Sequence, residues 1–325
     1  MPAHRGTGVQ SIMAWLATRS LKHTPMNNPR ALSGLAFATL LLIALMMGAN
    51  HVAARLAFNN GVDVATAVVF RSGVTVLVLA VILWVQRVPQ HFTPRHKRML
   101  PLIGLLVGVQ SLCLYSSVAR LPVALALLAF NTYPIWTALW ARVIYRQAPE
   151  RALLLAMPVI LLGLALALDV LGAASGLGAS LQWSRIGAGV GFALAAACTF
   201  GLALVITQHE AADIDGRVRT ATTLSMAGLM ALCLVGVQGG FHFPQAAIGW
   251  WGLAALSLLY GTAFTVMFTL LPKLGVVGNS AIMNVEPVFA LALAWLLLDQ
   301  SIAPVQVAGA LLVVGAVMAL GLRKR

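Results

Sequence analysis

One carboxylate lies inside a very apolar stretch of the chain. In SAIMNVEPVFALALAWLLLDQ (280–300), Glu286 is followed directly by Pro287, and most of the surrounding residues are apolar. A charge in such a stretch is costly, and a proline leaves a main-chain carbonyl in the preceding turn without its usual hydrogen-bond donor. These two groups together would suit a proton, an amine or a cation. The alternative is a structural role, in which a neutral glutamic acid makes one hydrogen bond between helices.

Polar and aromatic residues lie at similar places in other apolar stretches. Tyr133 precedes Pro134 as Glu286 precedes Pro287, and Trp136 lies one helical turn after Tyr133 on the same face. These rings would either stack on a flat or cationic ligand in a cavity or pack between helices. Further candidates for a substrate or proton pathway are Asn50, His51, Gln110, Tyr115, Asn131 and Asn284. The later asparagines would line a cavity or join helices by hydrogen bonds, and the histidine would exchange protons or be a satisfied buried side chain.

Arg71 is the one cation deep inside an apolar stretch. Such a group needs a partner, because an unpaired charge in hydrocarbon is expensive. Glu286 is the one carboxylate at comparable depth, so an ion pair between them is one interpretation. The interpretation that we favour is structural, with the guanidinium bonded to main-chain carbonyls at the ends of neighbouring helices.

Composition places these residues in a membrane protein. The chain has 325 residues, of which 60% are hydrophobic and only 9% are charged, and that is too little charge for the surface of a soluble protein of this length. Apolar runs long enough to cross about 30 Å of hydrocarbon recur throughout. We predict an all-α bundle of ten spans at 33–54, 63–86, 99–119, 122–143, 151–169, 186–208, 220–238, 249–271, 275–298 and 304–322.

The positive charges indicate the orientation of these spans. Seventeen of the lysines and arginines fall in segments on the side of the N-terminus, and three fall in loops on the other side. This bias predicts that both termini are cytoplasmic. Because the charges sit in short loops between spans, a nucleic-acid partner is not expected. Many arginines and alanines are typical of a bacterium with GC-rich DNA. Because the spans are helices, we expect the inner membrane. We expect a monomer or homodimer.

The chain contains an internal repeat. The stretches 108–147 and 261–300 match at a constant offset of 153, which pairs Asn131 with Asn284, Pro134 with Pro287 and Gln147 with Gln300. An odd number of spans separates the copies, so the repeats are inverted, as in transporters that expose a midplane site alternately to each side. We expect Pro134 and Pro287 to break their helices where the two halves form a cavity. The predicted organisation is a disordered cytoplasmic arm (1–32), a first five-helix repeat (33–170), a flexible outer loop (171–184) and a second five-helix repeat (185–325).

This arrangement resembles the EamA branch of the drug/metabolite transporter superfamily. The similar motifs are GANHVAARLAF (48–58), FRSG (70–73) and EPVFALALAWLLLDQ (286–300). The resemblance implies ten helices around a central cavity and a role in moving metabolites, since relatives export amino acids and other compounds. The family often has glycine–glutamate where this chain has Arg146–Gln147 and Asp299–Gln300. Many members have a tryptophan where this chain has Met47 or Gly48.

The predicted function is therefore a secondary transporter that exports small organic metabolites, amino-acid-like or amphiphilic, by alternating access. Proton coupling through Glu286 is one hypothesis, and a facilitator without ion coupling is its rival. A lipid-linked flippase of the same superfamily is the alternative function. An intramembrane enzyme is disfavoured because the spans lack paired aspartates or a Ser/His pair. The expected partners are a small-molecule substrate, the lipid bilayer and protons, with neither a cofactor nor a metal ion.

Overall fold

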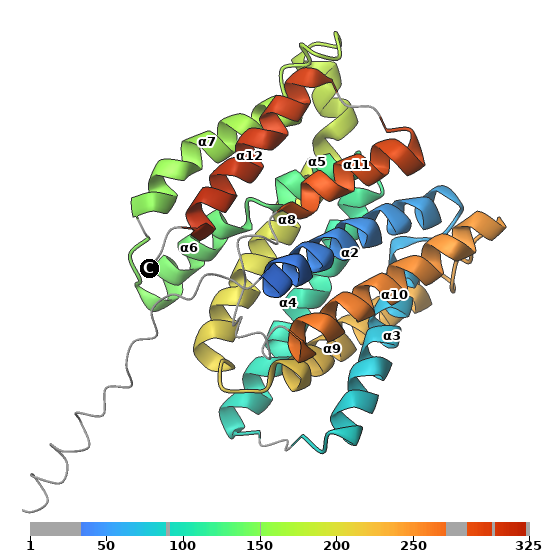
Figure 1. Cartoon of the computed structure of the whole chain (residues 1–325). Coiled ribbons are helices and arrows are strands. Elements are labelled where there is room, and N and C mark those ends of the chain that lie inside the picture. Colours follow the sequence, from blue (N-terminus) through green and yellow to red (C-terminus); the bar gives the residue numbers. More distant parts are fainter. Residues whose placement is uncertain (1–33, 89–91, 150, 271–284, 301–302, 323–325) are drawn as a thin grey trace, which may run out of the picture. The chain divides into compact units, whose positions relative to one another are not determined.

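Every regular element of the computed structural model is a helix. The structure describes residues 34–88, 92–149, 151–270, 285–300 and 303–322. Within them the elements run α2 (Gly34–Asn59), α3 (Val64–Val85), α4 (Pro94–Val118), α5 (Val123–Phe130), α6 (Tyr133–Tyr145), α7 (Arg151–Ala167), α8 (Ala179–Glu210), α9 (Gly216–Val237), α10 (Ala247–Thr269), α11 (Glu286–Leu298) and α12 (Pro304–Leu322). Figure 1 shows their course. The predicted all-α bundle is confirmed.

The described helices account for each of the ten predicted spans. Seven stretches are long and apolar enough to cross a membrane, with α5 and α6 counted together as Val123–Tyr145. Three shorter apolar helices, Leu154–Ala167, Glu286–Leu298 and Pro304–Ala319, supply the others. The predicted arm and the first part of the span predicted at 275–298 lie outside the described residues.

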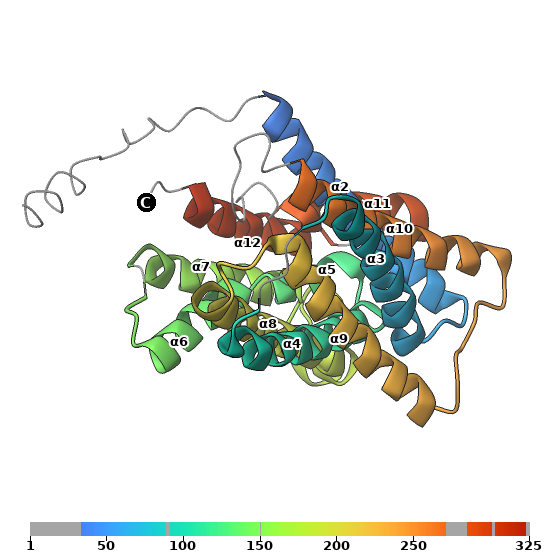
Figure 2. The same cartoon turned by 90° about the horizontal axis from the view of Figure 1, so that it is seen from below.

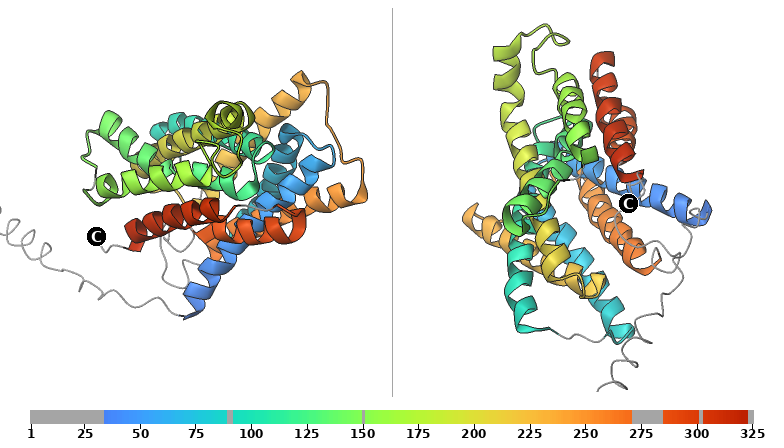
Figure 3. Two further views of the ribbon diagram at one scale, coloured as in Figure 1. Left: turned by 90° about the horizontal axis from the view of Figure 1, so that it is seen from above. Right: turned by 90° about the vertical axis from the view of Figure 1, so that its left-hand side faces the viewer.

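The helices form two layers, and α5 lies between them. Figures 2 and 3 show α4, α8 and α9 on one side and α2, α11 and α12 on the other. All residues of α5 from Val123 to Ala129 are buried, and they pack into the largest apolar core of the described residues. Burial around its whole circumference is what a helix hydrophobic on every side requires. On one flank, α7 lies along α12 (Figure 1).

The span predicted at 122–143 is interrupted next to Pro134, where we expect the proline to break the helix. Helix α5 ends at Phe130, two residues follow, and α6 starts at Tyr133 with Pro134 in its first turn. Proline suits that place because it lacks the N–H that an interior helical position must donate. Tyr133 and Trp136 both lie after the interruption, one helical turn apart in α6 as predicted.

The connection between α7 and α8 is shorter than the outer loop predicted at 171–184. Helix α8 already begins at Ala179, so the end of that segment is helical. The remaining turn is held by Asp169, whose carboxylate accepts hydrogen bonds from the main-chain N–H of Ala174 (3.0 Å) and of Ser175 (2.8 Å). Gln182 Nε2 also donates to the carbonyl of Leu168 (3.2 Å). These hydrogen bonds hold the turn, whereas its Gly, Ala and Ser residues predict a flexible loop.

The repeat is visible in the helices themselves. Helices α6 and α11 each have 13 residues and begin 153 positions apart, at Tyr133 and Glu286. Each ends at a residue in the left-handed conformation, Arg146 (φ 55°) and Asp299 (φ 52°). In both, the next N–H donates back to the carbonyl six residues earlier, at 3.2 Å. Glycine is the usual residue at a left-handed helix end.

Glycines at equivalent positions bring the two repeats into contact. A Cβ added to Gly48 of α2 would lie 3.0 Å from the main-chain N of Ala290 in α11. A Cβ added to Gly201 of α8 would lie 2.8 Å from the main-chain N of Thr137 in α6. Both glycines and both partners are 153 positions apart. Small residues of this kind allow close helix approach in a membrane, so each repeat presses its first helix onto the α6 or α11 helix of the other.

Candidate functional site

Glu286 and His51 meet at the contact between the two repeats. Glu286 is the first residue of α11, where the positive end of the helix dipole favours a carboxylate. Its Oε1 lies 3.2 Å from Nε2 of His51 in α2, and the two side chains are 23% and 4% exposed. The pair therefore joins the first repeat to the second at a place with little access to solvent.

The close approach of α2 explains how His51 reaches Glu286. Gly48 lies one turn before His51 and faces the first turn of α11, where an added Cβ would be 3.0 Å from the Glu286 carbonyl oxygen. Residues three apart on a helix share a face. A larger side chain at Gly48 would hold the helices apart and remove the histidine from the carboxylate.

Asn50 and Tyr115 lie beside this pair. The Tyr115 hydroxyl in α4 donates to Asn50 Oδ1 (3.1 Å), and neither residue has any exposed surface. The Tyr115 ring is 5.5 Å from the His51 ring, measured between centroids, and meets Phe58 edge-on at 5.9 Å. Two candidates from α2 and one from α4 are thus brought together.

Arg71 of α3 completes the cluster on its far side. It is 3% exposed, and its Nη2 donates to Ser111 Oγ in α4 (2.9 Å). The guanidinium carbon lies 4.7 Å from the centre of the Tyr115 ring and 4.0 Å from that of Tyr260 in α10. Cation–π contacts of this kind stabilise a desolvated guanidinium. The hydroxyl and the two rings stand where the sequence interpretation places main-chain carbonyls or Glu286. Gln110 also adjoins the cluster, since it accepts from Ser111 Oγ (3.4 Å).

Several polar atoms of this cluster have no hydrogen-bond partner. Among the described residues, the buried atoms without one include Asn50 Nδ2, His51 Nδ1 and Arg71 Nε. Most buried polar groups in proteins are bonded, so such exceptions need an explanation. Three in one cluster make this the candidate site of the described residues.

The aromatic candidates of α6 lie on the other side of the same contact. Tyr133 meets Phe200 edge-on (5.2 Å between ring centroids) and is close enough to Glu286 to interact with it electrostatically. Trp136 packs against α8, where its Cβ would be 2.9 Å from a Cβ on Gly201. Asn131 is buried at the end of α5. Asn284 lies outside the described residues.

Most residues of the polar cluster belong to the first repeat, and Glu286 and Tyr260 come from the second. The residues 153 positions after Asn50, His51 and Ser111 are Ala203, Leu204 and Phe264. In α9, the residue as far from its N-cap as Arg71 is from the N-cap of α3 is Thr223. The repeats therefore share their packing but not their chemistry. Tyr260 was not among the sequence candidates, and its place in the middle of a predicted span is the signal that could have found it.

A second group of charges lies at the ends of α4, α6 and α8. Arg95 forms an ion pair with Glu210, whose Oε1 also accepts from the Tyr145 hydroxyl (2.9 Å). The rings of Tyr145 and His209 are stacked with centroids 3.7 Å apart. The sequence alone did not indicate this group, because its members are distant in the chain. These contacts join α4, α6 and α8.

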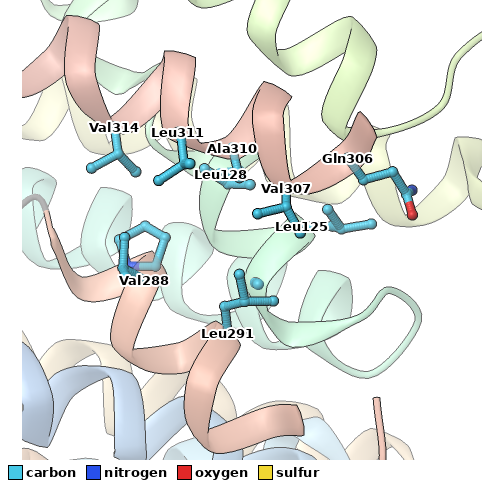
Figure 4. A pocket seen from close by; sticks show the side chains of 11 residues that line it. Leu125, Leu128, Val288, Leu291, Gln306, Val307, Ala310, Leu311 and Val314 are labelled. Atoms are coloured by element: carbon cyan, nitrogen blue, oxygen red, sulfur yellow. The ribbon is translucent and has the colours of Figure 1, made fainter. Parts of the chain in front are cut away.

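A small pocket opens next to Pro287 and is apolar. It lies between α5, α11 and α12, and Figure 4 shows the aliphatic side chains that surround it. Gln306 is its single polar side chain, and its Nε2 is already bonded to the Ala167 carbonyl (2.9 Å). This pocket therefore has no group that would recognise a polar substrate, and the polar cluster remains the better candidate site.

Comparison with known proteins agrees with this architecture. The model of the EamA-like transporter family matches residues 33–168 and again residues 187–322. The chain belongs to this family. The two matches coincide with the two five-helix repeats, and they establish a multi-pass membrane transporter of the drug/metabolite transporter superfamily.

The fold is also that of known structures. A crystal structure titled only "Crystal structure of protein" is similar, with a TM-score of 0.57 and 19% sequence identity over 88% of this chain and 97% of the other. At that identity the likeness concerns the fold alone. A search of curated proteins found no match.

Proposed function

We propose that this EamA-family protein is a secondary transporter that exports small organic metabolites, amino-acid-like or amphiphilic, and that Glu286 couples this movement to protons. The supporting observation is the His51–Glu286 pair, 3.2 Å apart, which joins the two repeats inside the membrane region. An ionisable residue in a transmembrane segment is by default a candidate for substrate or proton handling. We further propose that both termini face the cytoplasm of a bacterial cell, as the distribution of lysine and arginine indicates.

The pair has two states with different strengths. An ionised Glu286 accepts a charge-assisted hydrogen bond from His51, and a protonated Glu286 loses that charge and weakens the bond. An amine group of a substrate would compete for the same carboxylate. Because the partners belong to different repeats, either event loosens the contact between α2 and α11. Loosening one contact between inverted repeats is what alternating access requires.

The test is transport by the purified protein in liposomes. Uptake of labelled amino acids and amine-bearing compounds, chosen by a thermal-shift screen, is measured between pH 5.5 and 8.5 for the wild type and for Glu286→Gln. The control is Asp213→Asn, which alters another histidine–carboxylate pair (His96 Nε2 to Asp213 Oδ1, 3.1 Å) outside the cluster.

We expect the wild type and the control to share one pH profile. We expect Glu286→Gln to lose that pH dependence together with at least nine-tenths of the rate. A Glu286→Gln variant with wild-type rate and wild-type pH profile would overturn proton coupling through this residue. Movement of a labelled lipid without movement of any soluble compound would overturn metabolite export itself.

A further inference from the structure

We propose that Arg71 and Asn50 form a binding site for the carboxylate of the transported molecule, so that the substrates of this protein are small organic acids or zwitterions. The proposal rests on the proposed transport function and adds an anion site to it. Glu286 would receive a proton or an amine, and Arg71 would receive the carboxylate on the other side of Tyr115.

The charge of Arg71 is not balanced by the chain. The ion pairs of the described residues do not include Arg71, and Glu286 is paired with His51. The whole chain has eight acidic residues, and only Glu286 lies at a comparable depth. Of the others, Asp63, Asp169, Glu210, Asp213, Asp215 and Asp299 lie at helix ends or in loops, and Glu150 lies outside the described residues. An anion for Arg71 must therefore come from Glu286 after a rearrangement or from a bound molecule.

The unpartnered donors point to a bound molecule. Within the described part of the chain, Arg71 Nε and Asn50 Nδ2 are buried and lack acceptors. The Tyr115 hydroxyl holds the Asn50 oxygen (3.1 Å), so the amide nitrogen is left as the free donor. A cation and a neutral donor without acceptors are what an anion-binding site contributes.

The aromatic rings favour a planar anion that approaches in the plane of the guanidinium. The centres of the Tyr115 and Tyr260 rings lie 4.7 Å and 4.0 Å from the guanidinium carbon, and both rings pack against the guanidinium. The N–H groups of a guanidinium lie in its plane and point outward from its edge. Edge-on, two-bond pairing is the usual geometry between arginine and a carboxylate. Lysine would keep the charge but neither the fork nor the stacking, so it makes an informative variant.

The experiment compares each acid with its own amide. Binding of a panel of small amino acids and monocarboxylates, and of the matching amides and methyl esters, is measured with purified protein in nanodiscs by calorimetry and thermal shift. The variants are Arg71→Lys and Asn50→Ala. The control is Arg55→Gln, since Arg55 is a second half-buried arginine, whose Nη1 donates to the Val118 carbonyl (2.8 Å). Its Nε also lacks a partner, so this variant tests whether an unpartnered arginine nitrogen is by itself enough for the preference.

We expect acids to bind the wild type at least tenfold more tightly than their amides. We expect this preference to be lost in Arg71→Lys and reduced in Asn50→Ala, and to be kept in Arg55→Gln. Equal binding of acids and amides by the wild type would overturn the proposal without any variant. A preference for acids that survives in Arg71→Lys but disappears in Glu286→Gln would also overturn it.

The outcome separates this inference from the proposed function. Flux of a soluble compound with no preference for acids would leave transport standing and remove the carboxylate site. Binding of acids that depends on Arg71 without any flux in liposomes would leave the site standing and remove transport.

Discussion

The contact at Gly48 makes a sharp prediction about Gly48→Ala. The new methyl group would lie 3.0 Å from both the Ala290 nitrogen and the Glu286 carbonyl oxygen, and both are main-chain atoms that cannot turn aside. Relief requires α2 and α11 to separate by roughly half an ångström. From its present 3.2 Å, the His51–Glu286 distance would then exceed the limit of a hydrogen bond. Overpacking of this kind costs about 1–3 kcal/mol.

The matched control is Gly191→Ala in α8, because an added Cβ there has no atom within 4 Å. Replacing a helical glycine in open space stabilises a helix by up to about 1 kcal/mol. The unfolding temperature in detergent should therefore fall for Gly48→Ala and rise or stay level for Gly191→Ala. Gly201→Ala is the equivalent change in the second repeat. It should lower the unfolding temperature as Gly48→Ala does, but leave the pH profile of transport intact. A Gly48→Ala protein as stable as Gly191→Ala would refute the interlocked packing.

Two further predictions concern helix ends. Arg146→Gly and Asp299→Gly should each raise the free energy of unfolding by about 1 kcal/mol, because glycine adopts the left-handed conformation without steric cost; an unchanged or lower unfolding temperature would contradict a steric cost at these left-handed helix ends. Asp215 caps α9, and the hydrogen bond from Arg217 holds the pKa of Asp215 below its usual value. Its stabilisation is therefore present above the ordinary carboxyl range, near pH 4, and is lost as pH falls through the lowered folded pKa. Asp215→Ala should cost about 1 kcal/mol at neutral pH, and its unfolding temperature should converge with that of the wild type as the pH falls below the lowered pKa; a constant difference across pH would show that the carboxylate charge is not involved.

The fold was largely predictable because its signals are local. Apolar runs of spanning length and the offset of 153 predict the helices and their repetition, and the family match bears them out. The interruption before Pro134 is also a local signal. The turn after α7 was less predictable, because its order depends on one side chain, Asp169, that folds back on later N–H groups.

The candidate site could be predicted only as a set of residue types. Depth in apolar runs singled out Glu286, His51 and Arg71, and this needs no tertiary information. Which of them meet depends on how closely helices cross, and that is decided by Gly48 and by neighbours far away in the chain. Periodicity therefore could not distinguish a pair with Arg71 from a pair with His51. The roles of these residues in transport stay predictions.

The uneven chemistry of the two repeats has a consequence for how the sequence can drift. Helices of the second repeat that correspond to α2 and α4 bear aliphatic or phenyl groups where the first repeat has its polar set. Substitutions there need only preserve volume, whereas those in the first repeat also alter ligand choice. New specificities should thus arise by changes around Asn50 and Ser111, while the close packing around Gly201 stays the same. Aligned relatives that carry different cargo would reveal this as variation concentrated in one half.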